Sequence, residues 1–193
     1  MEIVFVSENE NKITEAREIL LPLGFQSIFC GVTCRETGLT FTENAVLKAQ
    51  AAVGSVKDVP IMADDSGICV DALNGMPGVL SSRWSQDGRN IDLLLWQMRD
   101  VPDVHRTAHF VCSIACVMPN TEVRTVSSVW HGRILHVPDG TGGFGYDPVF
   151  LPDGYSVSAA GLGSDLKNRI SHRYKALRLM SSLLKRTYSS CHA

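Results

Sequence analysis

Two adjacent carboxylates, Asp64 and Asp65, are the residues of this sequence whose type and position most strongly suggest chemistry. They follow the apolar run Ile61–Ala63 and precede Ser66 and Gly67. The run predicts a buried strand, and acidic groups at the end of such a strand are costly unless they hold a cation or accept several hydrogen bonds. At the carboxyl edge of an α/β sheet, carboxylates are suited to bind Mg²⁺. An ordinary Asp-Ser-Gly turn between two strands is the alternative.

Successive side chains of a strand point to opposite faces of a sheet, so Asp64 and Asp65 should not both face one site. We expect one of them to bind a metal ion and the other to fasten the loop. The motif alone does not say which residue has which role.

A polar segment follows the strand expected over residues 2–6 and opens the helix expected over residues 11–21. It consists of Ser7, Glu8, Asn9, Glu10, Asn11 and Lys12. Backbone N–H groups at the start of a helix attract phosphate, and a nearby lysine adds a mobile positive charge. The glycines and the Gly-Lys-Ser/Thr ending of a Walker loop are missing. A capped surface helix with an exposed lysine is the alternative.

Glycines and aromatic residues are interleaved in a later segment. The segment reads Gly142, Gly143, Phe144, Gly145, Tyr146, Asp147 and Pro148. Glycine lets the backbone approach a ligand, and the rings of Phe144 and Tyr146 offer surfaces on which a nucleobase can stack. Asp147, held extended by the following proline, could read the edge of a base or brace the loop. An ordinary glycine-rich hairpin is the alternative, but it leaves the aromatic rings unexplained.

Basic residues gather before the last helix, which we expect from about His172 to Lys185. Lys167, His172 and Arg173 belong to this group, and positive charge at the start of a helix opposes its dipole unless an anion joins it. Phosphate would supply that anion, and the carbonyl edge of a base could instead accept from His172 and Arg173. A solvated basic turn is the alternative.

One more carboxylate, Glu36, precedes a helix expected over residues 42–53. It could add a metal ligand, with Lys48 reaching across from the helix. Glu43 is better explained by the favourable position of an acidic residue at the start of that helix.

The composition is that of an ordinary globular protein, with 45% hydrophobic and 20% charged residues in 193. We expect one domain over residues 1–193. A net charge of −2 argues against a general nucleic-acid coat. No apolar stretch of about 18 residues could span a membrane, and no export signal is visible, so we expect a cytoplasmic protein.

The chain has six cysteines. They stand at Cys30, Cys34, Cys69, Cys112, Cys116 and Cys191. Cys112 and Cys116 alternate with Phe110, Ile114 and Met118, which predicts small core residues on one face of a strand. Their spacing does not favour a zinc site, and disulfides are not expected in the cytoplasm.

The order of the elements predicts an α/β fold with a mixed, twisted sheet flanked by helices. Besides the elements named above, we expect strand-like runs over residues 25–30 and 68–73, a helix over 90–99, and a long hairpin from 108–118 and 123–135. A (β/α)₈ barrel is excluded by the irregular alternation and the short chain.

The sequence resembles the inosine triphosphate pyrophosphatase family in six segments that occur in the family's order. They are Ser7-x-Asn9-x-x-Lys12, Glu36–Ala45, Ala63–Gly67, Gly75-x-Pro77-Gly78, Gly140–Pro148 and Ile170–Arg173. Each segment is weakly specific alone, but together they are specific and cover the chain from about Ile3 to Leu184.

The resemblance implies an elongated two-lobed fold with the active-site cleft between the lobes, and a homodimer. It implies Mg²⁺ at Glu36 and Asp65, with Asp65 also acting as the base that activates water. The phosphate path would run along residues 7–12, with Lys12 in the catalytic set. The other implied substrate contacts are Lys48, Ser66, Lys167, Phe144, Gly145, Tyr146, Asp147, His172 and Arg173.

The resemblance further implies hydrolysis of non-canonical purine nucleoside triphosphates (dITP, ITP and XTP) to the monophosphate and pyrophosphate. A pyrophosphatase of the same fold acting on another modified nucleotide is one alternative, and a non-catalytic nucleotide sensor is another. The acidic set counts against the sensor, since binding alone would not demand it. An RNA-binding module that stacks bases on Phe144 and Tyr146 is disfavoured by the net charge.

Overall fold

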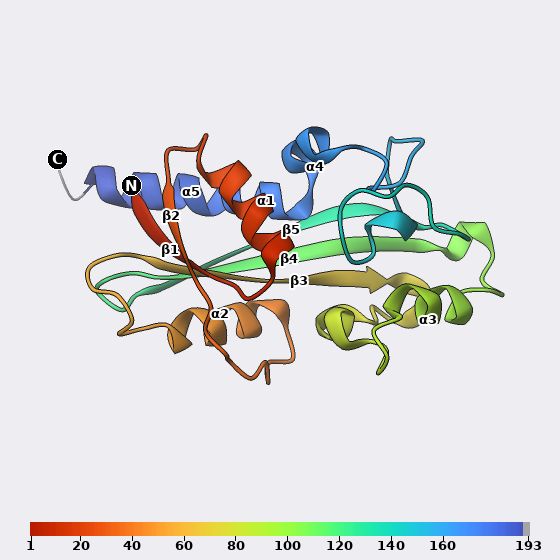
Figure 1. The fold of residues 1–193 in the computed structure, drawn as a ribbon, viewed down its shortest axis with the longest axis horizontal. Coiled ribbons are helices and arrows are strands. Elements are labelled where there is room, and N and C mark those ends of the chain that lie inside the picture. Colours follow the sequence, from red (N-terminus) through yellow and green to blue (C-terminus); the bar gives the residue numbers. More distant parts are fainter. Residues whose placement is uncertain (191–193) are drawn as a thin grey trace. The chain divides into compact units, whose positions relative to one another are not determined.

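The computed structural model describes residues 1–190, in which strands and helices alternate at first and strands then predominate (Figure 1). The strands are β1 (Glu2–Val6), β2 (Gln26–Cys30), β3 (Ile61–Val70), β4 (Thr107–Val117), β5 (Val123–Ile134) and β6 (Phe150–Pro152). The α-helices are α1 (Glu10–Leu20), α2 (Phe41–Ala51), α3 (Asn90–Gln97), α4 (Ser164–Ile170) and α5 (His172–Ser190). Cys191 lies outside the described residues, so the expectation for it is untested.

The six strands form one mixed sheet in the order β2-β1-β3-β4-β5-β6. β1 pairs in parallel with both β2 and β3, whereas β5 and β6 are antiparallel. The expected α/β fold with a mixed sheet flanked by helices is confirmed. Among residues 1–190, no helix is long and apolar enough to cross a bilayer.

The chain divides into two compact units, and the long strands β3, β4 and β5 contribute to both. Among the described residues, unit 1 comprises residues 1–65, 112–128 and 173–190, and unit 2 comprises residues 66–111 and 129–172. The boundary in β3 falls between Asp65 and Ser66.

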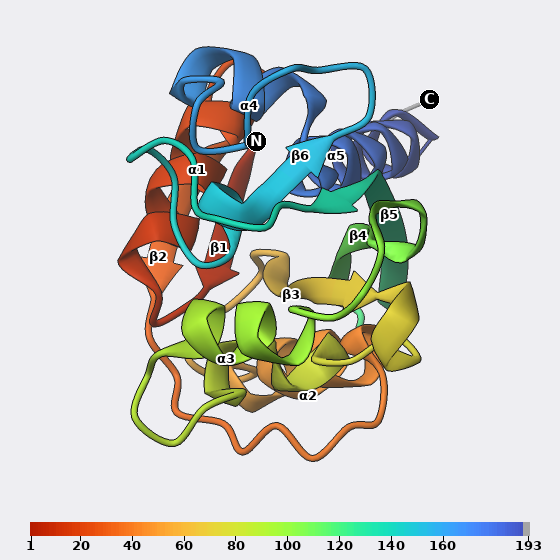
Figure 2. The same cartoon turned by 90° about the vertical axis from the view of Figure 1, so that its right-hand side faces the viewer.

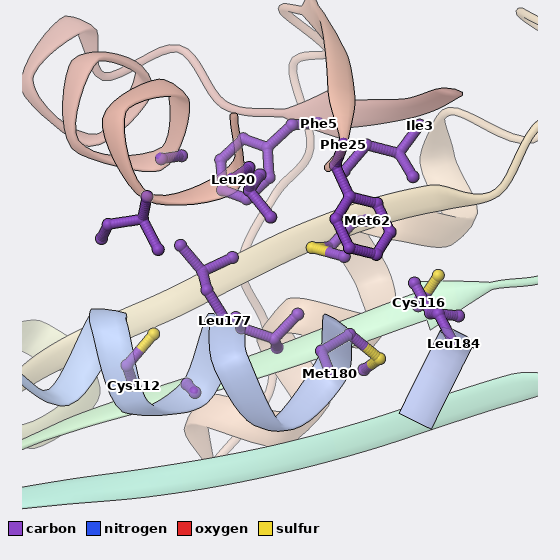
Figure 3. Packing of buried hydrophobic residues seen from close by; sticks show 14 of the residues in the cluster. Ile3, Phe5, Leu20, Phe25, Met62, Cys112, Cys116, Leu177, Met180 and Leu184 are labelled. Carbon is purple, nitrogen blue, oxygen red and sulfur yellow. The ribbon is translucent and has the colours of Figure 1, made fainter. Parts of the chain in front are cut away.

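In unit 1, α1 and α5 cover one face of the sheet and α2 covers the other (Figures 1 and 2). The α1/α5 face buries a large apolar cluster in which Phe5, Met62, Leu177 and Met180 are completely covered (Figure 3). Cys112 and Cys116 belong to this cluster, as the alternation in β4 predicts. Burial raises the pKa of both thiols to about 12, which keeps them protonated and unreactive.

A capping box formed by Thr40 and Glu43 sets the start of helix α2. The Thr40 hydroxyl accepts from the backbone N–H of Glu43, and the Glu43 carboxylate accepts from the N–H groups of Leu39 and Thr40 at 2.7 and 3.1 Å. The helix then packs on the sheet through small buried side chains, Ala45 and Ala49, which permit a close approach. This packing places the polar side chains of α2 against β3.

Unit 2 has its own core, to which α3 contributes the buried Leu94 and Met98. A fully buried arginine, Arg106, fastens the strands to the segment after α3. Its guanidinium donates to four backbone carbonyls, those of Met98, Val101, Ile134 and Leu135. These bonds offset the cost of burying the charge.

Some expectations about local structure are wrong. β3 does not end at Asp64 but runs unbroken to Val70, because both carboxylates find partners within the fold and the strand need not turn toward solvent. The turn reading of this segment is therefore also wrong. No helix was expected over residues 164–170, where α4 lies, and α5 extends to Ser190 rather than ending near Lys185.

Candidate active site

Asp64 lies at the centre of a buried charge network on the α1/α5 face of β3. Its Oδ2 is 3.2 Å from Nζ of Lys12 in α1, and it accepts from Nε and Nη2 of Arg173 in α5 at 3.4 and 3.3 Å. Arg173 also pairs with Glu15 of α1. Oδ1 of Asp64 is buried and accepts no hydrogen bond within the described part of the chain.

The network holds Asp64 ionised. Burial alone would raise the pKa of this carboxyl, but the nearby charges of Lys12 and Arg173 outweigh burial and hold its pKa well below the ordinary range. Burial would lower the pKa of the Arg173 guanidinium, but the carboxylates of Asp64 and Glu15 raise it. Asp64 therefore joins two helices to the sheet as a permanent anion.

Asp65, the next residue, faces α2. Its Oδ1 accepts from Nζ of Lys48 at 2.9 Å, and its Oδ2 accepts from Nδ2 of Asn44 at 3.3 Å. Nζ of Lys48 also donates to Oε1 of Glu36 at 2.9 Å. Two carboxylates, Glu36 and Asp65, thus converge on one ammonium group.

The two acidic neighbours differ in their proton affinity. Burial raises the pKa of Asp65, and Lys48 only partly opposes that effect. Burial would lower the pKa of Lys48, but the charges of Asp64 and Asp65 outweigh it and raise the pKa to about 12. The pKa of Asp64 is thus lowered while that of its neighbour Asp65 is raised. Neighbouring carboxyls whose pKa values are shifted apart are typical of acid–base sites.

The polar segment after β1 forms the start of α1, as expected. Asn9 is the N-cap, and its side chain accepts from the backbone N–H of Lys12 at 3.1 Å. The Ser7 hydroxyl accepts from the N–H of Asn9 at 3.2 Å. Glu8 is exposed and accepts from the Thr33 hydroxyl at 2.9 Å, which ties the segment to the chain after β2. Glu10 and Asn11 are exposed in the first turn.

A second polar group lies in unit 2, around the glycine-rich loop. Oδ2 of Asp147 accepts from Nζ of Lys167 at 2.5 Å and from the backbone N–H of Phe144 at 2.8 Å. Nζ of Lys167 also lies 4.7 Å from the centre of the Phe144 ring. A side chain at Gly143 would meet Asp147 at 2.1 Å, so the loop requires glycine there. Gly145 has a positive φ of 59° and is exposed.

Two further ring-bearing residues expected at the site, Tyr146 and His172, are buried. The Tyr146 ring belongs to the apolar core, and its hydroxyl donates to the backbone carbonyl of Ser81 at 3.0 Å. His172 is stacked on Phe110, with ring centres 4.7 Å apart and planes 6° apart, and lies 6.2 Å from Trp130. Tyr146, expected as a stacking surface, thus lies within the core, whereas Phe144 is half-exposed.

The structure groups the expected residues in a different way from the sequence analysis. Arg173, expected beside His172 around a base, pairs with Asp64 and Glu15 instead. Lys167 is buried, and Ser66 is half-buried in β3.

Sequence reasoning missed the roles of Glu15 and Asn44. The helical spacing could have revealed both, since Glu15 follows Lys12 by three residues and Asn44 precedes Lys48 by four.

Known proteins match this chain over nearly its whole length. A dITP/XTP pyrophosphatase of Tropheryma whipplei (strain Twist) is 98% identical over 193 residues, which is 100% of both chains. A dITP/XTP pyrophosphatase of Streptomyces coelicolor is 43% identical over 95% of this chain and 96% of its own. The solved structure of a HAM1 protein from Coxiella burnetii matches with a TM-score of 0.83 and 37% identity, covering 96% of this chain and 99% of that one.

The family model described as the Ham1 family matches residues 3–183, which include parts of both units. The resemblance noted from the sequence is thereby confirmed, and the chain belongs to the Ham1 family.

Proposed function

We propose that this protein hydrolyses non-canonical purine nucleoside triphosphates, dITP, ITP and XTP, to the monophosphate and pyrophosphate. It is a hydrolase that acts on triphosphates and removes deaminated nucleotides from the pool. The relatives named above are dITP/XTP pyrophosphatases and match this chain nearly end to end.

One observation carries the proposal of a catalytic centre in unit 1. Oε1 of Glu36 and Oδ1 of Asp65 each lie 2.9 Å from Nζ of Lys48. Two carboxylates that converge on a cation suit Mg²⁺, which is commonly held by one or two carboxylates together with waters and substrate phosphates. Among the described residues, no group of three or more His, Cys, Asp or Glu side chains could hold a metal ion.

We assign the metal to Glu36 and Asp65. When bound there, Mg²⁺ would neutralise charge on the phosphate oxygens. The buried Asp64, whose network maintains its negative charge, adds to the negative potential of this part of β3.

The side chains of unit 1 supply the remaining chemistry. Asp65 orients water and takes its proton as the water oxygen bonds to the α-phosphorus and pyrophosphate leaves. Lys12 and Lys48 hold the triphosphate, with charged hydrogen bonds worth about 1.5–3 kcal/mol each. The start of α1, with Ser7 and Asn9 beside it, lines the path of the phosphates.

We assign recognition of the base to unit 2. Phe144 offers a half-exposed ring, and the Asp147–Lys167 pair fixes the loop that carries it. A 6-oxo purine accepts a hydrogen bond where adenine donates one, so a pocket of donors leaves adenine with unpaired buried groups. His172 is the donor that we propose for this edge.

The proposal also includes the domain organisation, the oligomeric state and the cellular compartment of the protein. We propose that residues 1–193 act as one catalytic domain, consistent with the family model that includes both units. The family resemblance extends the proposal to a homodimer that acts in the cytoplasm on the nucleotide pool. Light scattering during size-exclusion chromatography tests the homodimer.

A substrate panel in ¹⁸O-labelled water tests the proposed function. ITP, XTP, dITP, GTP and ATP are supplied with Mg²⁺, and the products are identified by mass spectrometry. We expect rapid turnover of the first three, release of pyrophosphate, and the label in the monophosphate. Release of orthophosphate, or equal turnover of ATP, would contradict the proposal.

A further inference from the structure

Asn44 is the only completely buried polar side chain among the described residues of α2, and the proposed mechanism does not use it. A buried amide costs free energy unless both of its ends are hydrogen-bonded. In this structure both ends are. Oδ1 accepts from the backbone N–H of Gly38 at 2.8 Å, and Nδ2 donates to Oδ2 of Asp65 at 3.3 Å.

The chemistry of these partners allows one orientation of the amide. The N–H of Gly38 can only donate, so it requires the amide oxygen, and the amide nitrogen then faces the Asp65 carboxylate. Leucine could make neither bond. Aspartate could accept from Gly38 but could not donate to Asp65 while both carboxylates are ionised.

Through these bonds Asn44 connects the two carboxylates that we assign to the metal. Gly38 is two residues from Glu36, and its Cα lies so close to α2 that a side chain there would meet Glu43 at 2.6 Å and Asn44 at 2.8 Å. The loop that carries Glu36 is therefore held against the start of α2. The same helix holds Asp65 through Asn44 and, four residues later, through Lys48.

We propose that Asn44 is a positioning residue for the hydrolytic reaction. It fixes one oxygen of Asp65 through its amide nitrogen, and it fixes the loop of Glu36 through its amide oxygen. The inference rests on the function proposed above. Rigid support of this kind matters because small displacements of reacting groups cause large losses of rate.

Two substitutions at Asn44 separate its two bonds. Asn44→Ala removes both, whereas Asn44→Asp retains an acceptor for Gly38 and places a carboxylate opposite Asp65. The matched control is Ala49→Gly, which weakens the same helix at a buried position outside the site. For each variant we would measure kcat and KM for ITP, the melting temperature, and hydrogen exchange of the Gly38 amide in the metal-free protein.

We expect both Asn44 variants to lose at least tenfold in kcat, with KM changed less than threefold. Exchange of the Gly38 amide should be at least tenfold faster in Asn44→Ala and within threefold of wild type in Asn44→Asp. Ala49→Gly should lower the melting temperature while retaining kcat within threefold.

The proposal is overturned if Asn44→Ala keeps kcat within twofold of wild type. It is also overturned if Ala49→Gly, at a comparable melting temperature, loses as much kcat as the Asn44 variants. If the wild-type protein hydrolyses no nucleotide, the proposed function fails instead, whether or not the Gly38 amide responds to Asn44.

Discussion

Asp64 and Asp65 are consecutive residues of β3, yet their carboxylates have partners on opposite faces of the sheet. Asp64 meets Lys12 of α1 and Arg173 of α5, whereas Asp65 meets α2. Burial favours the neutral form of both carboxyls, and only at Asp64 do the neighbouring cations outweigh it. The strand thus separates a carboxylate whose pKa is lowered from one whose pKa is raised.

Asp64→Asn is expected to destabilise the fold more than Asp65→Asn does. Removing one partner from a buried ion pair leaves charge uncompensated and costs about 3–5 kcal/mol. At Asp64 the affected network joins α1, α5 and β3, whereas Lys48 keeps Glu36 when Asp65 is changed. Urea unfolding at pH 7 measures both free energies. Equal losses in the two variants would contradict the structural role of Asp64.

The depressed pKa of Asp64 predicts a loss of stability in acid. The unfolded chain has an aspartate pKa of about 3.9 and the folded chain a lower one, so protons bind preferentially to the unfolded state. The contribution is complete above about pH 5 and declines as the pH falls below about 4 toward the folded pKa. Between pH 5 and pH 3 the unfolding free energy of wild type should fall more steeply than that of Asp64→Asn. Parallel curves would argue against the effect.

Lys167→Met should destabilise unit 2 by about 3–5 kcal/mol, because it leaves the buried carboxylate of Asp147 without its adjacent ammonium group. The double variant Asp147→Asn/Lys167→Met is the control and should recover part of the loss. Unfolding in urea provides the measurement. A single variant as stable as wild type would show that the pair does not brace the loop.

Phe144→Ala should weaken substrate binding with little effect on the chemical step. Stacking of a base on an aromatic ring is worth about 1–3 kcal/mol, or about a 5- to 150-fold rise in KM for ITP. Tyr146→Phe serves as the control, since it removes only the hydroxyl that reaches Ser81 and keeps the buried ring. If the two variants had the same KM, Phe144 would not be the stacking surface.

Local patterns predicted most of the elements, because those elements carry their own signals. The periodic apolar residues of α1 and α5 and the alternation in β4 are readable within short windows, and so is the cap of α2. α4 has no such stripe: Leu166 is exposed and Lys167 is its buried residue, so nothing in its pattern favours a packed helix.

The site depends on pairing across long sequence separations, which local patterns do not encode. The six segments contain many of the polar residues of the site, but not Glu15, Lys48 or Lys167, and they do not show which residues are partners. Arg173 is 109 residues from Asp64 and 158 from Glu15, and its position beside His172 suggested a shared role that its contacts do not support. The continuation of β3 through Asp64 and Asp65 was not predicted for the same reason, because the cations that stabilise these carboxylates come from other elements of the chain.

The most direct test of this account is the rate of pyrophosphate release from ITP by Asp65→Asn at saturating Mg²⁺. The substitution keeps the size of the side chain and removes the proton acceptor. We predict a fall in kcat of at least about 10²-fold, the usual contribution of a general base, with the melting temperature within a few degrees of wild type. A variant that folds and retains kcat within tenfold of wild type would contradict the assignment of catalysis to Asp65.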